Sequence, residues 1–445
     1  MHGAELRPQR PGRQIVIAIL FGTLAVTLLM GIPVGFAVGM SSMAALLWDG
    51  SIPLVIMTQK MVDGINSFAL MALPLFILSG AIMVYGSTPR IMNFANMMLR
   101  KKRWGLGNTA VVGCAAFGTI SGSGVATTAA IGSIIAPEMV KRGYSPGFTA
   151  ALIAGSGTLG IIIPPSITFV VYAQVANVSI SNMFLAGFIP GILTALLLCF
   201  LNRMVVQKFN WCQSNEQQTF YEKLPAGEKW KIAGAATLPL FMPVIILGGV
   251  LSGLATPTEA AAVACVYALI LAMFVYREMS LSTMVSVFVD SAVTSSTILL
   301  IISAANPMAW LLTMQNTTTS LANWVMGISN NAVLVYGIVI AILLILGTFM
   351  ETLAITLLTV PIFLPILIKF GVDPIAYGIT SSLALCIGSV TPPLAVGLFT
   401  ACRILKIRVE DSVPEVFYVC GAMLIATIIT AIFPILSTFL PDLFL

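Results

Sequence analysis

Four short interruptions of the apolar stretches in this chain carry the residue types that could bind ions or small molecules. They span residues 118–124, 155–166, 347–352 and 388–393, and each combines glycine with serine or threonine. Small residues let a backbone leave helical geometry, so hydroxyls and freed carbonyls can ligate a hard cation there. Helix N-termini at the same interruptions can bind an anion. The alternative is close helix packing through small residues, which is common in membranes.

Glu351 is the ionisable residue within these interruptions. An ionisable side chain deep in an apolar segment is costly and is commonly functional. Three functional roles are open: a cation ligand, a proton carrier or a group that orients the turn. A structural hydrogen bond to backbone N–H groups is the alternative. Glu138 and Glu259 are weaker candidates, because Glu138 lies beside basic residues and Glu259 has the position of a first-turn helix acid.

Paired prolines end two of the interruptions. Pro164-Pro165 recurs as Pro392-Pro393, an offset of 228 residues, and Gly160 recurs as Gly388 at the same offset. Two adjacent prolines remove two backbone donors and disfavour helix in the preceding residue, which leaves nearby carbonyls free to coordinate a cation. The duplication predicts two related halves with a site at their interface, as in secondary transporters.

The elements that must position these interruptions are membrane-spanning helices. The 445 residues are 58% hydrophobic and 8% charged, with a mean hydropathy of +1.03, which indicates a polytopic membrane protein. No cleavable signal peptide is expected, because the apolar segment 15–30 is long enough to cross and no small-residue cleavage site closes it. The net charge of +5 then reports topology rather than an anionic partner.

The sequence predicts an all-α fold with two inverted repeats, each of five spanning helices and a re-entrant hairpin. The first repeat covers residues 15–206 after a tail at 1–14, and the second covers 232–445 after a linker at 207–231. Five crossings per half is an odd number, so the second copy must run inverted. The expected spans are 15–30, 33–48, 66–85, 147–175 and 183–205, then 232–252, 257–275, 283–304, 375–402 and 415–440, with hairpins at 105–140 and 331–369.

Charge supports the inversion. The basic run 100–103 precedes the first hairpin, whereas the basic residues Arg403, Lys406 and Arg408 follow the second Pro-Pro span, and the repeat-related stretches carry no charge. Basic loops belong in the cytoplasm, which places the linker there and both termini outside. The basic N-terminal tail contradicts that placement. The amphipathic run 89–104 is expected to lie at the interface as an arm helix, or to be an ordinary basic loop.

Several function classes are disfavoured. The only histidine, His2, lies in a polar tail, which argues against histidine-based catalysis and against a zinc site. None of the seven cysteines has metal-ligand spacing, and no Gly-Lys-Ser/Thr motif for ATP hydrolysis occurs. We therefore expect neither an enzyme nor a cofactor. A channel would need a continuous polar pore rather than two gated tips.

At these motifs the chain resembles the large membrane subunit, the DctM-like M subunit, of tripartite ATP-independent periplasmic (TRAP) transporters. The matching stretches are residues 31–35, 121–124, 136–144, 159–166, 255–260 and 388–393. The resemblance implies an ion-transporter-superfamily fold, an elevator motion and sodium-coupled uptake of an organic anion, usually a carboxylate, across the bacterial inner membrane. It also implies two partners, a small four-helix Q membrane subunit and a periplasmic substrate-binding protein.

The resemblance also implies which residues bind what. One sodium site would use Ser121 and Ser123 with carbonyls of Gly157, Gly160 and Ile163, and the other would use Thr348, Met350, Gly388 and Thr391. Substrate would lie near Ser123, Ser166, Glu351 and Pro393. Many relatives carry Asp in place of Glu351, which is a departure from the family pattern. The competing hypothesis is a self-sufficient sodium/dicarboxylate symporter of the same superfamily.

Overall fold

The computed structural model describes residues 13–99, 104–211, 225–317 and 331–444, with single positions at 320, 321, 323 and 327. Three regions singled out in the sequence lie outside the described residues: the tail up to residue 12, the basic run 100–103 and most of the linker, 212–224.

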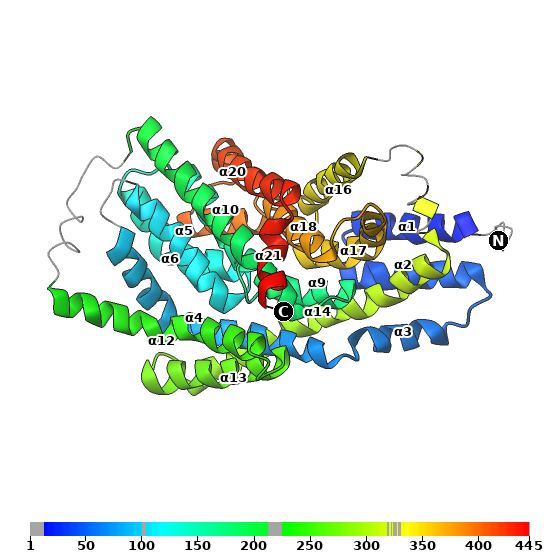
Figure 1. The fold of residues 1–445 in the computed structure, drawn as a ribbon, viewed down its shortest axis with the longest axis horizontal. Coiled ribbons are helices and arrows are strands. Elements are labelled where there is room, and N and C mark those ends of the chain that lie inside the picture. The colour runs from blue at the N-terminus through cyan, green and yellow to red at the C-terminus, as the bar shows by residue number, and fades with distance from the viewer. Residues whose placement is uncertain are drawn as a thin grey trace. The chain divides into compact units, whose positions relative to one another are not determined.

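Every regular element among the described residues is a helix (Figure 1). In chain order these are α1 (Arg13–Leu29), α2 (Val34–Asp49), α3 (Val55–Ile65), η1 (Phe68–Met71), α4 (Ala72–Leu99), α5 (Gly105–Ser121), α6 (Gly124–Lys141), α7 (Pro146–Gly157), α8 (Leu159–Ile162), α9 (Ile167–Ala176), α10 (Ile180–Lys208), α12 (Ala226–Leu251), α13 (Pro257–Leu269), η2 (Ile270–Val275), α14 (Leu281–Met314), α16 (Ala332–Gly347), α17 (Thr352–Lys369), α18 (Pro374–Gly388), α19 (Val396–Leu405), η3 (Glu410–Ser412), α20 (Val413–Ile432) and α21 (Ile435–Phe444).

The described helices make this a multi-pass membrane protein. Seven of them are long and apolar enough to cross a membrane, and the bent pair Pro146–Ile162 and Ile167–Ala176 would make eight. Six shorter apolar helices, α1, α2, α16, α18, α19 and α21, fall below that length. The total of ten crossings and the inversion of the repeat stay predictions.

Most predicted segments coincide with helices, and three differences have physical causes. The sequence does not predict α3, because its polar residues lower its hydropathy below that of a span. The predicted span 283–304 ends ten residues short of the end of α14 at Met314. The helix that contains most of the run 89–104 begins slightly earlier than predicted, directly after a kink inside α4 where Tyr85 and Gly86 have non-helical backbone and Gly86 has a φ of 87°, and it ends at Leu99.

The chain forms two compact units, each built from both halves of the sequence. Unit 1 comprises Met1–Ser67, Ser296–Val335 and Leu357–Gly371, and unit 2 comprises Phe68–Ser295, Tyr336–Thr356 and Val372–Leu445. Within unit 1, α1 packs on α2, and α3 packs on the later part of α14. Asn306 Nδ2 donates to the Lys60 carbonyl at 2.7 Å, and the absent side chain of Gly64 makes room for Asn306.

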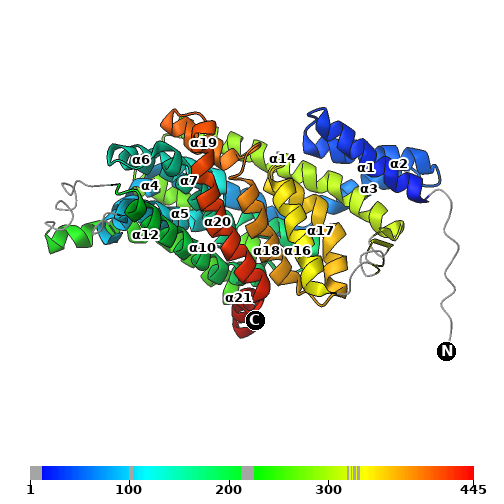
Figure 2. The same cartoon turned by 90° about the horizontal axis from the view of Figure 1, so that it is seen from above.

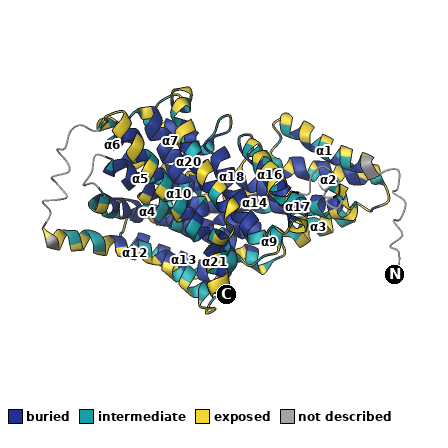
Figure 3. Ribbon diagram, turned by 45° about the horizontal axis from the view of Figure 1, so that its top comes forward, coloured by how far each residue is buried: buried dark blue, intermediate teal, exposed yellow. Residues whose placement is uncertain are grey.

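Unit 2 holds all four interruptions. Its outer layer contains α4, α12 and α13, which lie side by side (Figure 1), and its interior contains α5, α7 and α18, which are largely buried (Figure 3). The long helices α10 and α20 run across α18, and α19 packs on α6 and α7 (Figure 2). Tyr172 joins the two repeats inside this unit. Its Oη, in the first repeat, donates to the Pro374 carbonyl of the second repeat at 2.5 Å.

Two of the acidic candidates have structural partners. Glu259 forms a capping box with Thr256 at the start of α13, so its interpretation as a first-turn helix acid is confirmed. Glu138 Oε1 lies 3.0 Å from Arg142 Nε on the last turns of α6. Neither carboxylate is therefore a good candidate for ligand binding.

Candidate functional site

The tip of hairpin 1, which comprises α5 and α6, gathers hydroxyl and carbonyl oxygens. Gly122 has a φ of 61° and ends α5, and Ser123 caps α6 by accepting a hydrogen bond from the Ala126 N–H. Ser121 Oγ lies 2.7 Å from Thr127 Oγ1, and Thr127 Oγ1 lies 2.8 Å from the Ser123 carbonyl oxygen. Thr127 is six positions after Ser121 and four after Ser123. The three oxygens meet because the chain reverses direction at Gly122.

The same tip packs backbone against backbone on the break between α7 and α8. A Cβ on Gly160 would lie 2.6 Å from Thr127 Oγ1 and 2.9 Å from the Ser123 carbonyl oxygen, and a Cβ on Gly118 would lie 2.7 Å from the Gly160 Cα. Glycine is needed at both positions because the two backbone segments approach so closely. The structure thus brings Ser121, Ser123 and Gly160 together, as the sequence analysis expected.

Two buried hydroxyls behind this tip have no partner among the described atoms. They are Thr128 Oγ1 and Ser156 Oγ, whose residues are 1% and 0% exposed. Thr128 Oγ1 points at Gly157, where a Cβ would lie only 1.9 Å from it. A buried hydroxyl without a partner is costly, which favours an ion or a water molecule at this place.

The first Pro-Pro break positions Ser166 and Ile163 differently from the tip residues. Ser166 is buried and its Oγ donates to the Ile161 carbonyl at 2.5 Å, so its hydroxyl is already engaged. Ile163 has extended backbone and packs against α10, where a Cβ on Gly191 would lie 2.5 Å from its side chain. The Ile167 N–H donates to the Gly122 carbonyl at 3.4 Å, which links the break to the tip.

Hairpin 2, which comprises α16 and α17, has its turn at residues 348–351 and meets α18 in the same way. A Cβ on Gly388 would lie 2.3 Å from the Gly347 carbonyl carbon, so only glycine fits at this crossing. The Leu394 N–H donates to the Thr348 carbonyl at 2.9 Å and so repeats the link made by Ile167 in the first copy. The peptide bond between the paired prolines is cis in both copies.

Glu351 is the N-terminal cap of α17. Its Oε2 accepts hydrogen bonds from the N–H groups of Leu353 at 3.2 Å and Ala354 at 3.4 Å. Glu351 therefore stands where Ser123 stands in the first copy, 228 positions earlier. Of the four interpretations of this carboxylate, its contacts favour the structural hydrogen bond to the turn.

The other predicted residues of the second copy have the following contacts and exposure. Thr391 Oγ1 donates to the Ile387 carbonyl at 2.8 Å and lies 3.4 Å from Cys420 Sγ. Met350 is half-buried, and Pro393 is exposed.

The two copies differ in where their hydroxyls lie. At the offset of 228, Thr127 corresponds to Ile355 and Ser156 to Ala384, whereas Ile163 corresponds to Thr391. The first copy therefore has hydroxyls at Thr127 and Ser156 that the second lacks, and the second has a hydroxyl at Thr391 that the first lacks. Thr127, Thr128 and Ser156 were absent from the predicted site. The signal for Thr127 was its position one helical turn after Ser123.

The fold and these tips agree with what the chain resembles. The sequence model of the DctM component of tripartite ATP-independent periplasmic transporters matches residues 21–436. The chain belongs to this DctM family of TRAP transporter large permeases. The family consists of transporter permeases rather than enzymes, and the resemblance seen in the sequence is confirmed.

Named DctM relatives differ in substrate. The chain is 37% identical to the isethionate TRAP transporter permease protein DctMQ of Oleidesulfovibrio alaskensis, over 81% of this chain and 56% of that protein. It is 40% identical to the C4-dicarboxylate TRAP transporter large permease protein DctM of Pseudomonas aeruginosa, over 71% of this chain and 73% of that protein.

A solved structure supports the fold of the DctM chain. The YdaH transporter of Alcanivorax borkumensis superposes with a TM-score of 0.58 at 11% sequence identity, covering 85% of this chain and 88% of that one. At this identity the likeness concerns the fold alone.

The capping geometry of Glu351 predicts a distinct mutational pattern. Glu351→Ala leaves two N–H groups of α17 without an acceptor, which costs about 1 kcal/mol, and we expect uptake to fall about fivefold. Glu351→Asp and Glu351→Asn keep a good capping side chain, so both should stay within about twofold of the parent protein. Uptake rates and unfolding temperatures of the three variants measure this. An Asn variant as impaired as Ala would assign the role to the charge instead.

Proposed function

We propose that this chain is the permease of a sodium-driven TRAP transporter that takes up an organic anion. The observation that carries the proposal is the oxygen cluster at the tip of hairpin 1, where Ser121, Thr127 and the Ser123 carbonyl gather beside two buried hydroxyls without partners. Oxygen ligands are what a hard monovalent or divalent cation prefers. Among the described residues no group of three His, Cys, Asp or Glu side chains gathers, so hydroxyls and carbonyls are the candidate donors.

The anionic substrate class is supported by charge and by the relatives. Isethionate and C4-dicarboxylates, named for two relatives, are both organic anions. The N-terminus of α6 is capped by the neutral side chain of Ser123. The N-terminus of α17 is capped by the Glu351 carboxylate, which already places a negative charge there. A substrate carboxylate is therefore expected at the first tip, and a carboxylate is the substrate group that we propose.

The proposal includes the partners and the location of the protein. The family is one component of a tripartite transporter. We infer that this chain works in the bacterial inner membrane with a small four-helix Q subunit and a periplasmic substrate-binding protein. The hairpins and Pro-Pro spans would move together against the scaffold helices within residues 15–85, as in an elevator mechanism.

Sodium dependence is the test of the proposed site. Thr127→Val removes a hydroxyl that would ligate the ion, and losing one hydrogen-bonding oxygen from a charged group is worth about 1.5–3 kcal/mol. We expect the sodium concentration for half-maximal uptake to rise about tenfold or more. Thr127→Ser keeps the oxygen and should stay close to the parent protein. The measurement is uptake of radiolabelled isethionate and succinate into proteoliposomes that contain all three components.

The controls separate the site from general damage. Thr237→Val changes a threonine on α12 whose hydroxyl donates only to the Ala233 carbonyl, so its sodium dependence should not change. Uptake that runs equally well on potassium, or on a proton gradient alone, would show that sodium is not the coupling ion.

A further inference from the structure

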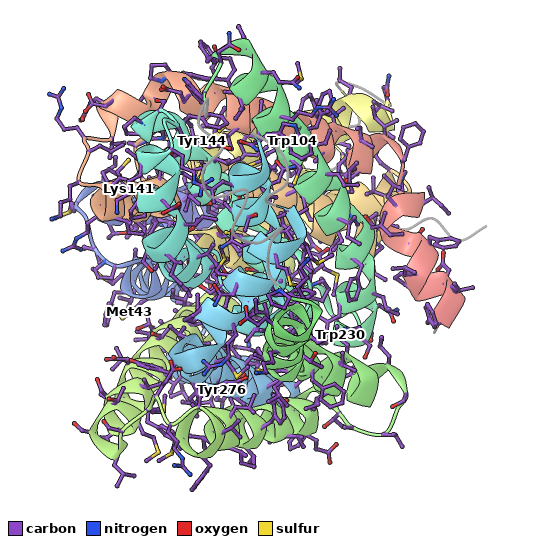
Figure 4. The ribbon with its side chains drawn as sticks, turned by 90° about the vertical axis from the view of Figure 1, so that its left-hand side faces the viewer. Met43, Trp104, Lys141, Tyr144, Trp230 and Tyr276 are labelled. Carbon is purple, nitrogen blue, oxygen red and sulfur yellow. The ribbon has the colours of Figure 1, made fainter. Side chains whose placement is uncertain are left out.

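Aromatic and basic side chains gather at the side of unit 2 where hairpin 1 opens. The start of α5, the end of α6 and the end of α10 meet there, at the left of Figure 1, and Figure 4 faces this side with Trp104, Lys141 and Tyr144 labelled. We call this set the headgroup platform. It consists of three basic residues and three aromatic residues: Lys141, Arg203, Lys208, Trp104, Phe209 and Trp211.

Buried hydrogen bonds make the platform rigid. Asn202 Nδ2 donates to the Trp104 carbonyl at 2.8 Å and to Asn108 Oδ1 at 2.7 Å, which ties α10 to α5. The Gly107 N–H donates to Tyr144 Oη at 3.2 Å, which ties α5 to the end of α6. The open end of hairpin 1 is thus fixed to α10 before any ligand binds.

The aromatic rings of the platform pack on buried rings of unit 2, and Phe209 is exposed. The ring of Trp211 stacks on Phe209 with centroids 5.2 Å apart, and its other neighbours are Phe148 at 5.4 Å and Tyr144 at 6.0 Å. Amphipathic rings at the end of spanning helices are typical of the headgroup level of a bilayer. We therefore expect the platform to lie at the level of the lipid headgroups.

The basic residues of the platform are exposed, and among the described residues they have no acidic partner. The Arg203 guanidinium lies 5.7 Å from the Trp104 ring centroid, and Lys208 Nζ lies 5.4 Å from that of Phe209. Within the described part of the chain, no carboxylate forms an ion pair with Lys141, Arg203 or Lys208. Four more basic residues, 100–103, directly precede Trp104 in the sequence.

We propose that the headgroup platform binds the phosphate of an anionic phospholipid. Clusters of Lys and Arg immediately beside spanning helices attract anionic headgroups, and the nearest acid on α6, Glu138, is already paired with Arg142. The aromatic rings hold the cations in place and fit the boundary between headgroups and acyl chains. A phosphate bound at Arg203 lies beside Trp104 and so stabilises the contact of α10 with the start of α5, the open end of hairpin 1.

The test compares lipids added to the purified full-length chain in neutral detergent. A ligand that binds the folded state raises its unfolding temperature, so phosphatidylglycerol should raise the midpoint more than phosphatidylcholine does. The variant with Lys141→Gln, Arg203→Gln and Lys208→Gln should lose at least about half of that difference, and raising the salt concentration should weaken it. Glycerol phosphate and inorganic phosphate at the same concentration should give no shift, because they lack the acyl chains that the rings contact.

A matched control removes three exposed charges elsewhere, through Arg277→Gln, Lys369→Gln and Arg403→Gln, and should keep the full lipid-dependent shift. If the platform variant does not fold, Arg203→Gln alone should lose part of the shift and Arg203→Lys should retain it. Equal shifts with the two lipids, or a shift lost equally in platform and control variants, would overturn the proposal. A shift with inorganic phosphate as large as that with phosphatidylglycerol would make the site a free-anion site and overturn it as well.

Discussion

Replacing Gly388 with alanine should abolish most transport. The new Cβ would lie 2.3 Å from the carbonyl carbon and 2.4 Å from the Cα of Gly347, and neither backbone atom can rotate away. Overpacking a tight contact costs about 1–3 kcal/mol, and 1.4 kcal/mol is a factor of ten in an equilibrium. Because the contact holds the turn of hairpin 2 against α18, we expect the initial uptake rate to fall at least about tenfold.

Two other glycine variants calibrate this result. Gly347→Ala places its Cβ 3.1 Å from the Gly388 Cα, so its loss of uptake should be smaller than that of Gly388→Ala. Gly421→Ala on α20 meets nothing within 4 Å and should leave uptake and unfolding temperature unchanged or slightly raise the latter. Uptake rates per folded protein in proteoliposomes rank the three. A Gly388→Ala variant that transports at the rate of Gly421→Ala would show that the crossing does not position a site.

The repeat made the crossings of hairpin and Pro-Pro span predictable. Gly160 and Gly388 share the offset of 228 residues, and both meet the backbone of a hairpin tip, at Gly118 and Gly347. Such a contact leaves a clear mark in a sequence, because only glycine fits and the requirement occurs twice. The break at each tip was predictable for the same reason, since small residues interrupt an otherwise apolar run.

The hydroxyls behind the first tip were harder to predict. Thr127, Thr128 and Ser156 have no polar counterparts that would mark them as a set, because Thr127 corresponds to Ile355 and Ser156 to Ala384. Hydroxyls in apolar helices commonly donate to a carbonyl one turn back, as Thr149 does, so their presence alone does not indicate a site. Only the chain reversal at the tip shows which of them meet.

Glu351 illustrates a second limit of sequence reasoning. A carboxylate at membrane depth indicates function on grounds of cost, yet the same residue at a helix start satisfies two N–H groups that would otherwise lack partners. The helix boundary decides between these roles, and a boundary is uncertain by a residue or two in a sequence. The equivalence with Ser123 became visible only once both turns were placed.

The largest effect that we expect comes from omitting partners. Purified and reconstituted alone into proteoliposomes with an inward sodium gradient, this chain should not take up isethionate or succinate above the background of empty vesicles. Adding the small membrane subunit and the periplasmic binding protein should raise uptake about a hundredfold or more. Partners that bind the transport-competent state about 2.7 kcal/mol more tightly than the inactive state raise the ratio of the two states by that factor.

The physical reason lies in the exposed apolar surface and in substrate delivery. Large apolar side chains such as Leu254 and Trp230 are 87% and 77% exposed on this chain, so they are available to contact lipid or a partner subunit. A binding protein that delivers substrate from the periplasm also raises its local concentration at the site. Omitting either partner singly should give the same loss, and Thr127→Val should impair the complete system without changing binding-protein docking. Robust sodium-driven uptake by the isolated chain would instead identify a self-sufficient symporter, in which the two hairpin tips suffice for both recognition and gating.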